Sequence, residues 1–254
     1  MLEKRTLEKE AQNAIIWIRE YVEKTGANGI VIGNSGGKDS ATVLAMAVKA
    51  IGNEKVISVA MPCFSKETDL EDAKLVAEAF EVPLLKVDLS NIYQEMENEI
   101  NRQIPQSLTL EAIVNMKPRL RMTTLYGIAQ TLGYLVIGTG NLCEAMVGYT
   151  TKWGDNSSDF NPIGNFIVEE VLAIGKMLGV PEKILQKAPS DGLGGQTDEE
   201  KMGIQYSQVA EMIETGTTDE TAKKEIIKRY QVSKHKRRTV PIYTFERKNY
   251  LLEL

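Results

Sequence analysis

The chain has 254 residues, of which 43% are hydrophobic, and a formal net charge of −5. This length suits one large α/β domain, and the hydrophobic share is sufficient for a packed core. The acidic balance argues against a general nucleic-acid or membrane surface, and no apolar run approaches the roughly 18 residues of a membrane span. Cys63 and Cys143 are too few for a disulfide framework and are expected to be reduced, buried thiols.

The chain is expected to begin with an amphipathic helix followed by a buried strand. Apolar residues recur at helical spacing over Thr6–Lys24, and Gly26 marks the end of this helix. The charged residues at its start are unlike a signal peptide, so a cytoplasmic protein is expected. The β-branched run Ile30–Ile32 then predicts a strand of a buried sheet, which ends at Gly33.

A polar loop of sequence Gly-Asn-Ser-Gly-Gly-Lys-Asp-Ser connects this strand to the next helix. Backbone N–H groups at a helix N-terminus attract an anion, and glycines let a phosphate approach the backbone. Hydroxyl and lysine side chains add further donors. The loop is therefore predicted to hold the phosphates of a nucleotide, and its candidate contacts are Gly33, Asn34, Ser35, Gly36, Gly37, Lys38, Asp39 and Ser40.

This loop differs from the common phosphate-binding motifs. Ile32 occupies the position of the first glycine of a Walker A motif, Asp39 follows Lys38 where that motif has Ser or Thr, and the dinucleotide pattern Gly-x-Gly-x-x-Gly is absent. A carboxylate such as Asp39 would repel a phosphate unless a cation lay between them. The loop therefore predicts a nucleotide bound with Mg²⁺. A plain Gly-Ser turn is the alternative, against which the Lys-Asp-Ser ending argues.

Strands and helices are predicted to alternate along the rest of the chain. The predicted strands are Val56–Ala60, Leu84–Leu89 and Tyr134–Ile137. The predicted helices are Thr68–Phe80, opened by a capping box of Thr68 and Glu71, then Asn91–Ile100, Leu108–Met116, Pro118–Leu132, Val168–Leu178, Glu199–Glu214 and Asp219–Tyr230. Long polar loops are predicted at Gly148–Pro162 and Pro189–Thr197. This alternation predicts an α/β fold, a doubly wound parallel sheet of Rossmann-like type flanked by helices.

In such a sheet, ligands bind beyond the carboxyl ends of the strands. The phosphate loop and the segment Gly138–Glu144 follow two of these strands, so both are expected on the same rim. Glu144 is then the natural second carboxylate for a Mg²⁺ ion that Asp39 also holds, because Mg²⁺ uses one or two carboxylates together with phosphate oxygens. The alternative is that Glu144 only stabilises the first turn of a helix.

The loop Ser35–Ser40 resembles the pyrophosphate loop of the ATP pyrophosphatase superfamily, and the chain as a whole resembles the NAD synthetases. The segments that carry the resemblance are Ser35–Ser40, Arg119–Met122, Gly138–Asn141 with Glu144, Gly148–Asp155, Asp159, Asn161–Pro162, Ala188–Ser190, Gln196–Glu199 and His235–Arg238. They occur in order over almost the whole chain. The most specific are the run that begins at Gly148 and the basic run His235–Arg238.

The resemblance implies one domain over residues 1–254, similar in fold to the adenine nucleotide alpha hydrolases, with a flexible basic tail from about residue 232 to 254. It implies a ligase that makes NAD from deamido-NAD, ATP and ammonia. The nicotinate carboxylate attacks the α-phosphate of ATP, pyrophosphate leaves, and ammonia then displaces AMP. It also implies a homodimer whose partners are these small molecules, with no nucleic acid and no membrane.

Individual site residues follow from the same resemblance. ATP would be bound by the phosphate loop together with Thr139 and Ser190, and Mg²⁺ by Asp39 and Glu144. The positions that match deamido-NAD contacts are Arg119, Lys152, Asp159, His235 and Lys236. Cationic side chains suit the phosphates and carboxylate of that substrate. His235 is the only histidine, so a metal site with several histidine ligands is excluded.

The sequence departs from the family at Val168, where an ATP-binding lysine is usual. This departure leaves two alternatives open: another adenylating ATP pyrophosphatase, or a degenerate nucleotide-binding paralogue. An RNA-modifying pyrophosphatase would carry a basic appendage or a cysteine pair, and the acidic balance and the run beginning at Gly148 argue against it.

Overall fold

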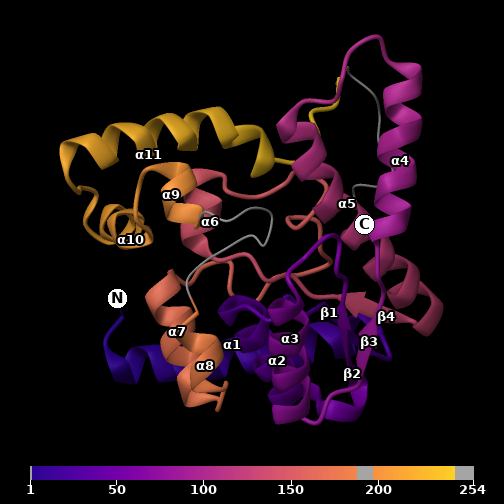
Figure 1. Cartoon of the computed structure of the whole chain (residues 1–254). Coiled ribbons are helices and arrows are strands. Elements are labelled where there is room, and N and C mark those ends of the chain that lie inside the picture. Colours follow the sequence, from indigo (N-terminus) through magenta and orange to yellow (C-terminus); the bar gives the residue numbers. More distant parts are fainter. Residues whose placement is uncertain (1, 188–196, 244–254) are drawn as a thin grey trace, which may run out of the picture.

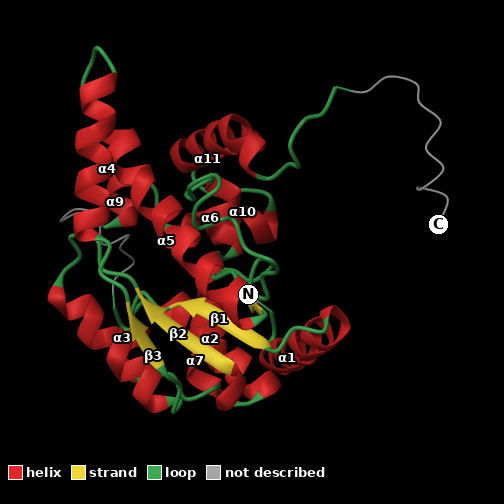
Figure 2. Ribbon diagram, turned by 90° about the vertical axis from the view of Figure 1, so that its right-hand side faces the viewer, coloured by secondary structure: helices red, strands yellow, loops and turns green. Residues whose placement is uncertain are grey.

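The computed structural model describes residues 2–187 and 197–243. At its centre is a parallel sheet of four strands in the order β3-β2-β1-β4 (Figures 1 and 2). The strands are β1 (Gly29–Gly33), β2 (Val56–Ala60), β3 (Leu84–Lys86) and β4 (Tyr134–Val136). Crossover helices link them, as parallel pairing requires. The predicted doubly wound α/β fold is therefore confirmed.

Helices cover both faces of the sheet because residues of β1 point alternately to either side. Ile30 and Ile32 pack into one apolar cluster with α1 (Lys4–Thr25), α2 (Lys38–Ile51) and α7 (Val168–Met177), and Val76 of α3 (Glu67–Ala79) joins it. Val31 packs on the other side with residues of α4 (Ser90–Gln103) and α5 (Leu110–Leu132). All three side chains of β1 are fully buried, as the β-branched run predicts.

A third apolar cluster lies beyond the sheet, on the side where the strands end (Figure 1). It is built from short helices of the second half of the chain. These are α6 (Leu142–Val147), α9 (Asp198–Met202), α10 (Tyr206–Thr215) and α11 (Glu220–Val232), and the start of α7 also contributes. The remaining elements are α8 (Glu182–Leu185) and the short 3-10 turns η1 (Asn53–Lys55) and η2 (Ser233–Lys236).

The prediction of two helices separated before Pro118 is wrong. The structure has one helix, α5, which runs through Pro118 from Leu110 to Leu132. A proline inside a helix removes one hydrogen bond, but Met116 and Met122 on either side of it are both buried in the same cluster. This continuous burial outweighs the lost hydrogen bond. Together with α4, the first half of α5 projects from the body of the molecule (Figure 2).

Other predicted boundaries also differ from the structure. Helix α3 begins at Glu67 after Lys66, so Thr68 lies inside its first turn and forms no capping box. Strand β3 ends at Lys86 rather than Leu89. The single helix predicted over Glu199–Glu214 is divided into α9 and α10, because Gly203 adopts a left-handed conformation with φ of 69° and ends the first of them. Within the described residues, no helix is long and apolar enough to cross a bilayer.

Helices α2 and α7 approach each other closely at Gly175, and we predict an effect on stability there. A Cβ atom there would lie 2.5 Å from Oγ1 of Thr42, which is fully buried, and 2.9 Å from Cδ2 of Leu185. We expect Gly175→Ala to lower the free energy of unfolding by about 1–3 kcal/mol, because overpacking outweighs the better helix propensity of alanine. Chemical denaturation of the two proteins measures this difference.

The matched control is Gly127→Ala in the middle of α5, where a new Cβ would meet nothing within 4 Å. Here only helix propensity changes, and we expect a gain of roughly 0.5–1 kcal/mol. Equal effects of the two substitutions would contradict the inferred close approach at Gly175.

Candidate functional site

The phosphate loop is held from beneath by Asn34, whose side chain is buried. Its Nδ2 donates to Oγ of Ser58 at 3.0 Å and to the carbonyl of Ala73 at 2.9 Å, while its Oδ1 accepts from the N–H of Gly36 at 3.0 Å. Its own backbone N–H donates to the carbonyl of Val59. Asn34, predicted as an ATP contact, therefore supports the loop from within the protein in this structure.

Gly36 and the two serines shape the upper side of the loop. Gly36 has a φ of 71°, and a Cβ atom there would lie 2.7 Å from the carbonyl oxygen of Asp69 on α3. Only glycine fits this combination of conformation and close approach. The hydroxyls of Ser35 and Ser40 lie 3.0 Å apart, and Ser40 also donates to the carbonyl of Gly37. The loop is thus preformed at the N-terminus of α2, which suits an anion.

The predicted meeting of the two rim segments is confirmed at Asn141. Asn141 is the N-cap of α6 and forms a capping box with Glu144: its Oδ1 accepts from the Glu144 N–H at 3.0 Å, and its own N–H donates to Oε2 of Glu144 at 2.9 Å. Its Nδ2 donates to Oδ1 of Asp39 at 3.2 Å. Asn141 therefore contacts both candidate metal carboxylates, Asp39 through its side chain and Glu144 through its backbone N–H. Thr139 lies on the same rim and is half-buried.

Carboxylates outnumber the basic groups that act on Glu144, which follows Asn141 on α6. Burial and the negative charge of Asp39 raise the pKa of Glu144 well above its usual value, whereas the hydrogen bond from Asn141 and the charge of Lys38 act in the opposite direction. Lys38 is itself buried and lies 3.2 Å from Asp39. Two nearby carboxylates that share one lysine can both ionise readily only if another cation is present. The donor set therefore fits a divalent cation.

The chemistry of these donors also indicates which cation fits. The described residues include no group of three or more His, Cys, Asp or Glu side chains arranged for a metal. Mg²⁺ does not need one, because it keeps water and phosphate oxygens as its other ligands. Asp39 and Glu144 fit that coordination.

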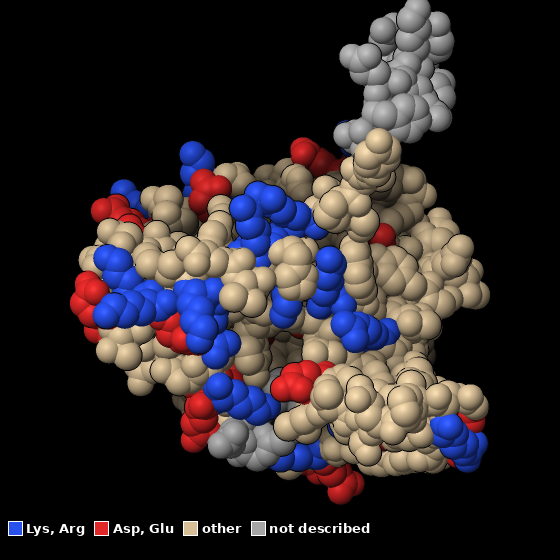
Figure 3. Space-filling model, turned by 90° about the horizontal axis from the view of Figure 1, so that it is seen from above, with Lys and Arg blue, Asp and Glu red and all other residues tan. Residues whose placement is uncertain are grey.

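Basic side chains gather around a hollow on the face above the sheet (Figure 3). Nε of Arg119, on α5, donates to the carbonyl of Lys152 at 3.2 Å, and the Lys152 ammonium lies 5.1 Å from the ring centroid of Trp153. Lys236 reaches the same loop from the far end of the chain and donates to the carbonyls of Gly148 and Thr150 at 2.8 and 2.5 Å. Three of the predicted deamido-NAD contacts thus meet at this loop.

The other predicted contacts are placed differently. Oδ2 of Asp159 accepts from the N–H of Val136 at 2.7 Å and Oδ1 from the hydroxyl of Tyr126 at 3.1 Å, so this carboxylate fastens its loop to β4 and α5. His235 lies exposed in η2. Ser190, predicted to contact ATP, lies outside the described residues.

The beginning of the predicted flexible tail is anchored in the structure. Arg237 donates to the carbonyl of Ala145 at 2.8 Å, to Oγ of Ser233 at 2.7 Å and to the carbonyl of Tyr230. Ser233 packs so closely on Gly148 that a Cβ at that glycine would overlap it. These contacts attach residues 233–237 to α6 and to the loop that follows it. Residues 244–254 lie outside the described part.

Val168 is buried at the start of α7 in the third apolar cluster, with Cys143 and Val147 of α6. It is only 6% exposed. Residue 168, where the family usually has a lysine, therefore takes part in an apolar contact between α6 and α7. One of the α6 residues in this contact, Cys143, immediately precedes Glu144 in the sequence. Among the lysines, Lys38 lies beside Asp39, with its ammonium 3.2 Å from that carboxylate.

Two residues near the site were not found from the sequence. Asp155 accepts from the N–H of Thr151 at 2.6 Å, and its negative charge contributes to the raised pKa of Glu144. Its place in the specific run beginning at Gly148 was an available signal. Tyr206, at the start of α10, is buried with its hydroxyl among the carboxylates of this region. No sequence pattern pointed to it.

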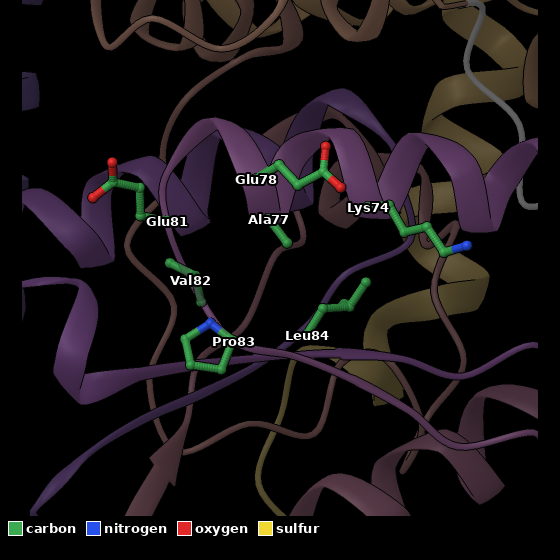
Figure 4. Close-up of a pocket in the computed structure, with 7 residues that line it drawn as sticks. All are labelled: Lys74, Ala77, Glu78, Glu81, Val82, Pro83 and Leu84. Atoms are coloured by element: carbon green, nitrogen blue, oxygen red, sulfur yellow. The ribbon is translucent and has the colours of Figure 1, made fainter.

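A separate hollow lies at the opposite end of the sheet, where α3 ends and β3 begins (Figure 4). It is open and lies at the amino end of its strand, whereas ligands of parallel sheets bind at the carboxyl ends. It is therefore not the candidate site. Its lining residues are Lys74, Ala77, Glu78, Glu81, Val82, Pro83 and Leu84.

Comparisons with known proteins agree with this geometry. Residues 10–249 match the model of the NAD synthase family. An NH(3)-dependent NAD(+) synthetase of Carboxydothermus hydrogenoformans is 41% identical over 232 residues, which are 91% of this chain and 95% of that protein. The family match spans every segment on which the resemblance rests.

Two solved structures are similar over nearly their full length. The NMN synthetase of Francisella tularensis has a TM-score of 0.88 at 32% identity and covers 94% of this chain and 99% of its own. The NH3-dependent NAD synthetase of Campylobacter jejuni has a TM-score of 0.77 at 27% identity, with the same coverage of both chains. With the phosphate loop, the carboxylate pair and the basic loop in place, this chain belongs to the NAD synthase family and is similar to its ammonia-dependent members.

Proposed function

We propose that this chain is an ammonia-dependent ligase that makes NAD from deamido-NAD and ATP, and that Mg²⁺ acts with ATP. The observation that carries the proposal is the joining of Asp39 and Glu144 through Asn141, beside a preformed phosphate loop. A non-catalytic nucleotide-binding protein would not need a second buried carboxylate whose pKa is raised by the first. The family membership supplies the substrates.

In the first step, a carboxylate oxygen of deamido-NAD attacks the α-phosphorus of ATP, and the bond to pyrophosphate breaks. The loop amides and the N-terminus of α2 orient the phosphates, and Lys38 adds positive charge. Asp39 and Glu144 would hold Mg²⁺, which supplies charge neutralisation for the phosphate oxygens when bound. The remaining contribution of the chain is positioning.

In the second step, ammonia forms the amide bond and AMP leaves with the carboxylate oxygen that it received. Water competes for the same acyl carbon, so the intermediate must be shielded. The loop 148–162 and the tail close one side of the hollow through the hydrogen bonds of Arg119 and Lys236. These two cations and Lys152 would also bind the phosphates of the dinucleotide.

We further propose a homodimer and a cytoplasmic location. The projecting pair α4 and α5 exposes the apolar side chains of Ile92 and Leu110, at 54% and 72%, and these suit a contact with a second copy. Both cysteines are free and buried, as expected in a reducing compartment.

The state of the two cysteine thiols indicates which nitrogen donor the protein uses, because hydrolysis of glutamine would need a reactive thiol. Burial raises the pKa of Cys63, and raises that of Cys143 to about 12, so neither is an activated nucleophile for glutamine. We expect the purified protein to form NAD, AMP and pyrophosphate from ATP, Mg²⁺, deamido-NAD and ammonium, and no NAD from ammonia-free glutamine. Product analysis by chromatography tests this, and equal rates with the two nitrogen donors would refute it.

A second candidate is the same amidation on a mononucleotide. The solved structure with a TM-score of 0.88 is named an NMN synthetase. The assay therefore includes nicotinate mononucleotide beside deamido-NAD at equal concentration. A higher kcat/KM for the dinucleotide supports deamido-NAD as the substrate. A higher kcat/KM for the mononucleotide would instead assign nicotinate mononucleotide as the substrate.

Asp39→Asn separates a ligase from a nucleotide binder, because it keeps size and hydrogen bonding but removes the charge. Loss of a metal-held phosphate contact costs several kcal/mol of transition-state stabilisation, so we expect pyrophosphate release to slow by roughly a thousandfold. Glu144→Gln keeps the capping box and is expected to act in the same direction. The double variant should lose much less than the sum if both residues serve one ion.

Pyrophosphate release at saturating ATP and varied Mg²⁺ measures these effects. Glu170→Gln is the matched control, because Oε2 of Glu170 accepts a hydrogen bond from the backbone N–H of Ile167, the N-cap of α7, as Oε2 of Glu144 does from the N-cap of α6. We expect this control to retain nearly full activity. A turnover of Asp39→Asn close to that of the unmodified protein, with unchanged Mg²⁺ dependence, would rule out the metal assignment.

Val168→Lys tests whether the missing family lysine matters. Because Val168 is buried against α6, a lysine there must bury its charge near Glu144, which costs stability unless an anion is bound. We expect a lower melting temperature without ligand and tighter ATP binding, measured by thermal melting and calorimetry. Val168→Met is the uncharged control. If both variants melted alike and ATP affinity stayed unchanged, position 168 would have no role in ATP binding.

A further inference from the structure

Tyr206 is the first residue of α10 and packs against α6, the helix that carries Glu144. Its ring belongs to the third apolar cluster together with Cys143 and Val147, the residues that flank Glu144 on α6. It is only 3% exposed. The side chain therefore extends from the outer layer toward the carboxylate pair.

The hydroxyl of Tyr206 has no hydrogen-bond partner, although its oxygen is shielded from solvent. Leaving such a group unpaired costs about 1–3 kcal/mol, and most buried polar groups in proteins are paired. Phenylalanine would fill the same space without that cost. The neighbouring Tyr149 shows the usual arrangement, since its hydroxyl donates to Oδ1 of Asp198 at 3.1 Å.

The groups around this hydroxyl are anionic. Besides burial, the negative charges of Glu144, Asp198 and Asp39 raise the pKa of Tyr206 strongly, with Glu144 contributing the most among them. The phenol thus keeps its proton and remains a hydrogen-bond donor. Because Tyr206 packs with Cys143, the residue that precedes Glu144 on α6, its unpaired hydroxyl is a candidate donor to the Glu144 carboxylate.

We propose that Tyr206 is a positioning residue for the cation site, and that its hydroxyl donates to the Glu144 carboxylate when the cation and ATP are bound. Residues of this kind orient metal-binding carboxylates in many proteins, and losing one weakens metal binding by 10–100-fold as an order of magnitude. The inference rests on the proposed function, because it requires Asp39 and Glu144 to bind a cation. In the cation-free protein, the unpaired hydroxyl is then a cost that binding removes.

Tyr206→Phe tests this inference with two readouts that a purely structural role would move differently. Mn²⁺ binding is measured by electron paramagnetic resonance in the presence of α,β-methylene-ATP, whose α–β bond cannot be cleaved. We expect at least about tenfold weaker Mn²⁺ binding. Thermal melting of the cation-free variant should show an unchanged or higher melting temperature, because an unpaired buried hydroxyl is removed.

Tyr93→Phe is the matched control, since Tyr93 is 2% exposed and its hydroxyl is paired with the carbonyl of Ile113 at 3.2 Å. This variant should melt at a lower temperature and bind Mn²⁺ normally. A lower melting temperature of Tyr206→Phe, or Mn²⁺ binding equal to that of the unmodified protein, would overturn the inference.

The variant Asp39→Asn distinguishes a failure of the inference about Tyr206 from a failure of the proposed function. If Asp39→Asn loses Mn²⁺ binding while Tyr206→Phe retains it, the metal site stands and the role of Tyr206 is refuted. If the unmodified protein binds no Mn²⁺ with α,β-methylene-ATP, the metal assignment fails and the inference fails with it.

Discussion

The hydrogen bonds of Asn141 are the interaction on which the site depends. Asn141 binds Glu144, three residues after it, and Asp39, 102 residues before it in the sequence. Two carboxylates repel each other, and Asn141 donates a hydrogen bond to each of them, from its side-chain amide to Asp39 and from its backbone N–H to Glu144. Because Asn141 is also the N-cap of α6, the helix that carries Glu144 cannot shift without breaking the link to the phosphate loop.

Two groups in an unfavourable state in the free protein lie around that link. Glu144 has a raised pKa, and Tyr206 has an unpaired buried hydroxyl. Local conflicts of this kind are expected where a ligand completes the interactions. The location of the conflict therefore agrees with the chemistry assigned to the rim.

The rest of the fold supplies rigid support for a site made of loops. Asn34 fixes the phosphate loop to β2 and α3, and Gly36 rests directly on the first turn of α3. On the other side, Lys236 and Arg237 fasten the segment that follows α11 to α6 and to the loop after α6. Segments far apart in sequence thus form one wall. Such preorganisation limits the reorganisation needed when substrates bind.

The sequence alone determined the sheet, the phosphate loop and the rim. The β-branched run at Ile30–Ile32 and the glycine-rich loop after it are local signals, and the geometry of parallel sheets then places both motifs at the same edge. The sequence also indicated the family, because short runs typical of that family occur in order over almost the whole chain. Helix boundaries followed where capping and glycine signals were local, as at the ends of α1 and α5.

Only the tertiary structure decided what depends on distant neighbours. Helix α5 continues through Pro118 because both of its halves face one core. Asn34 proved to be a supporting residue and Val168 an apolar contact, since their surroundings come from other elements. Tyr206 carries no local signal at all. Its significance arises from burial and from charges on α2, α6 and α9, and electrostatic and desolvation effects are properties of three-dimensional proximity, which no pattern along the chain encodes.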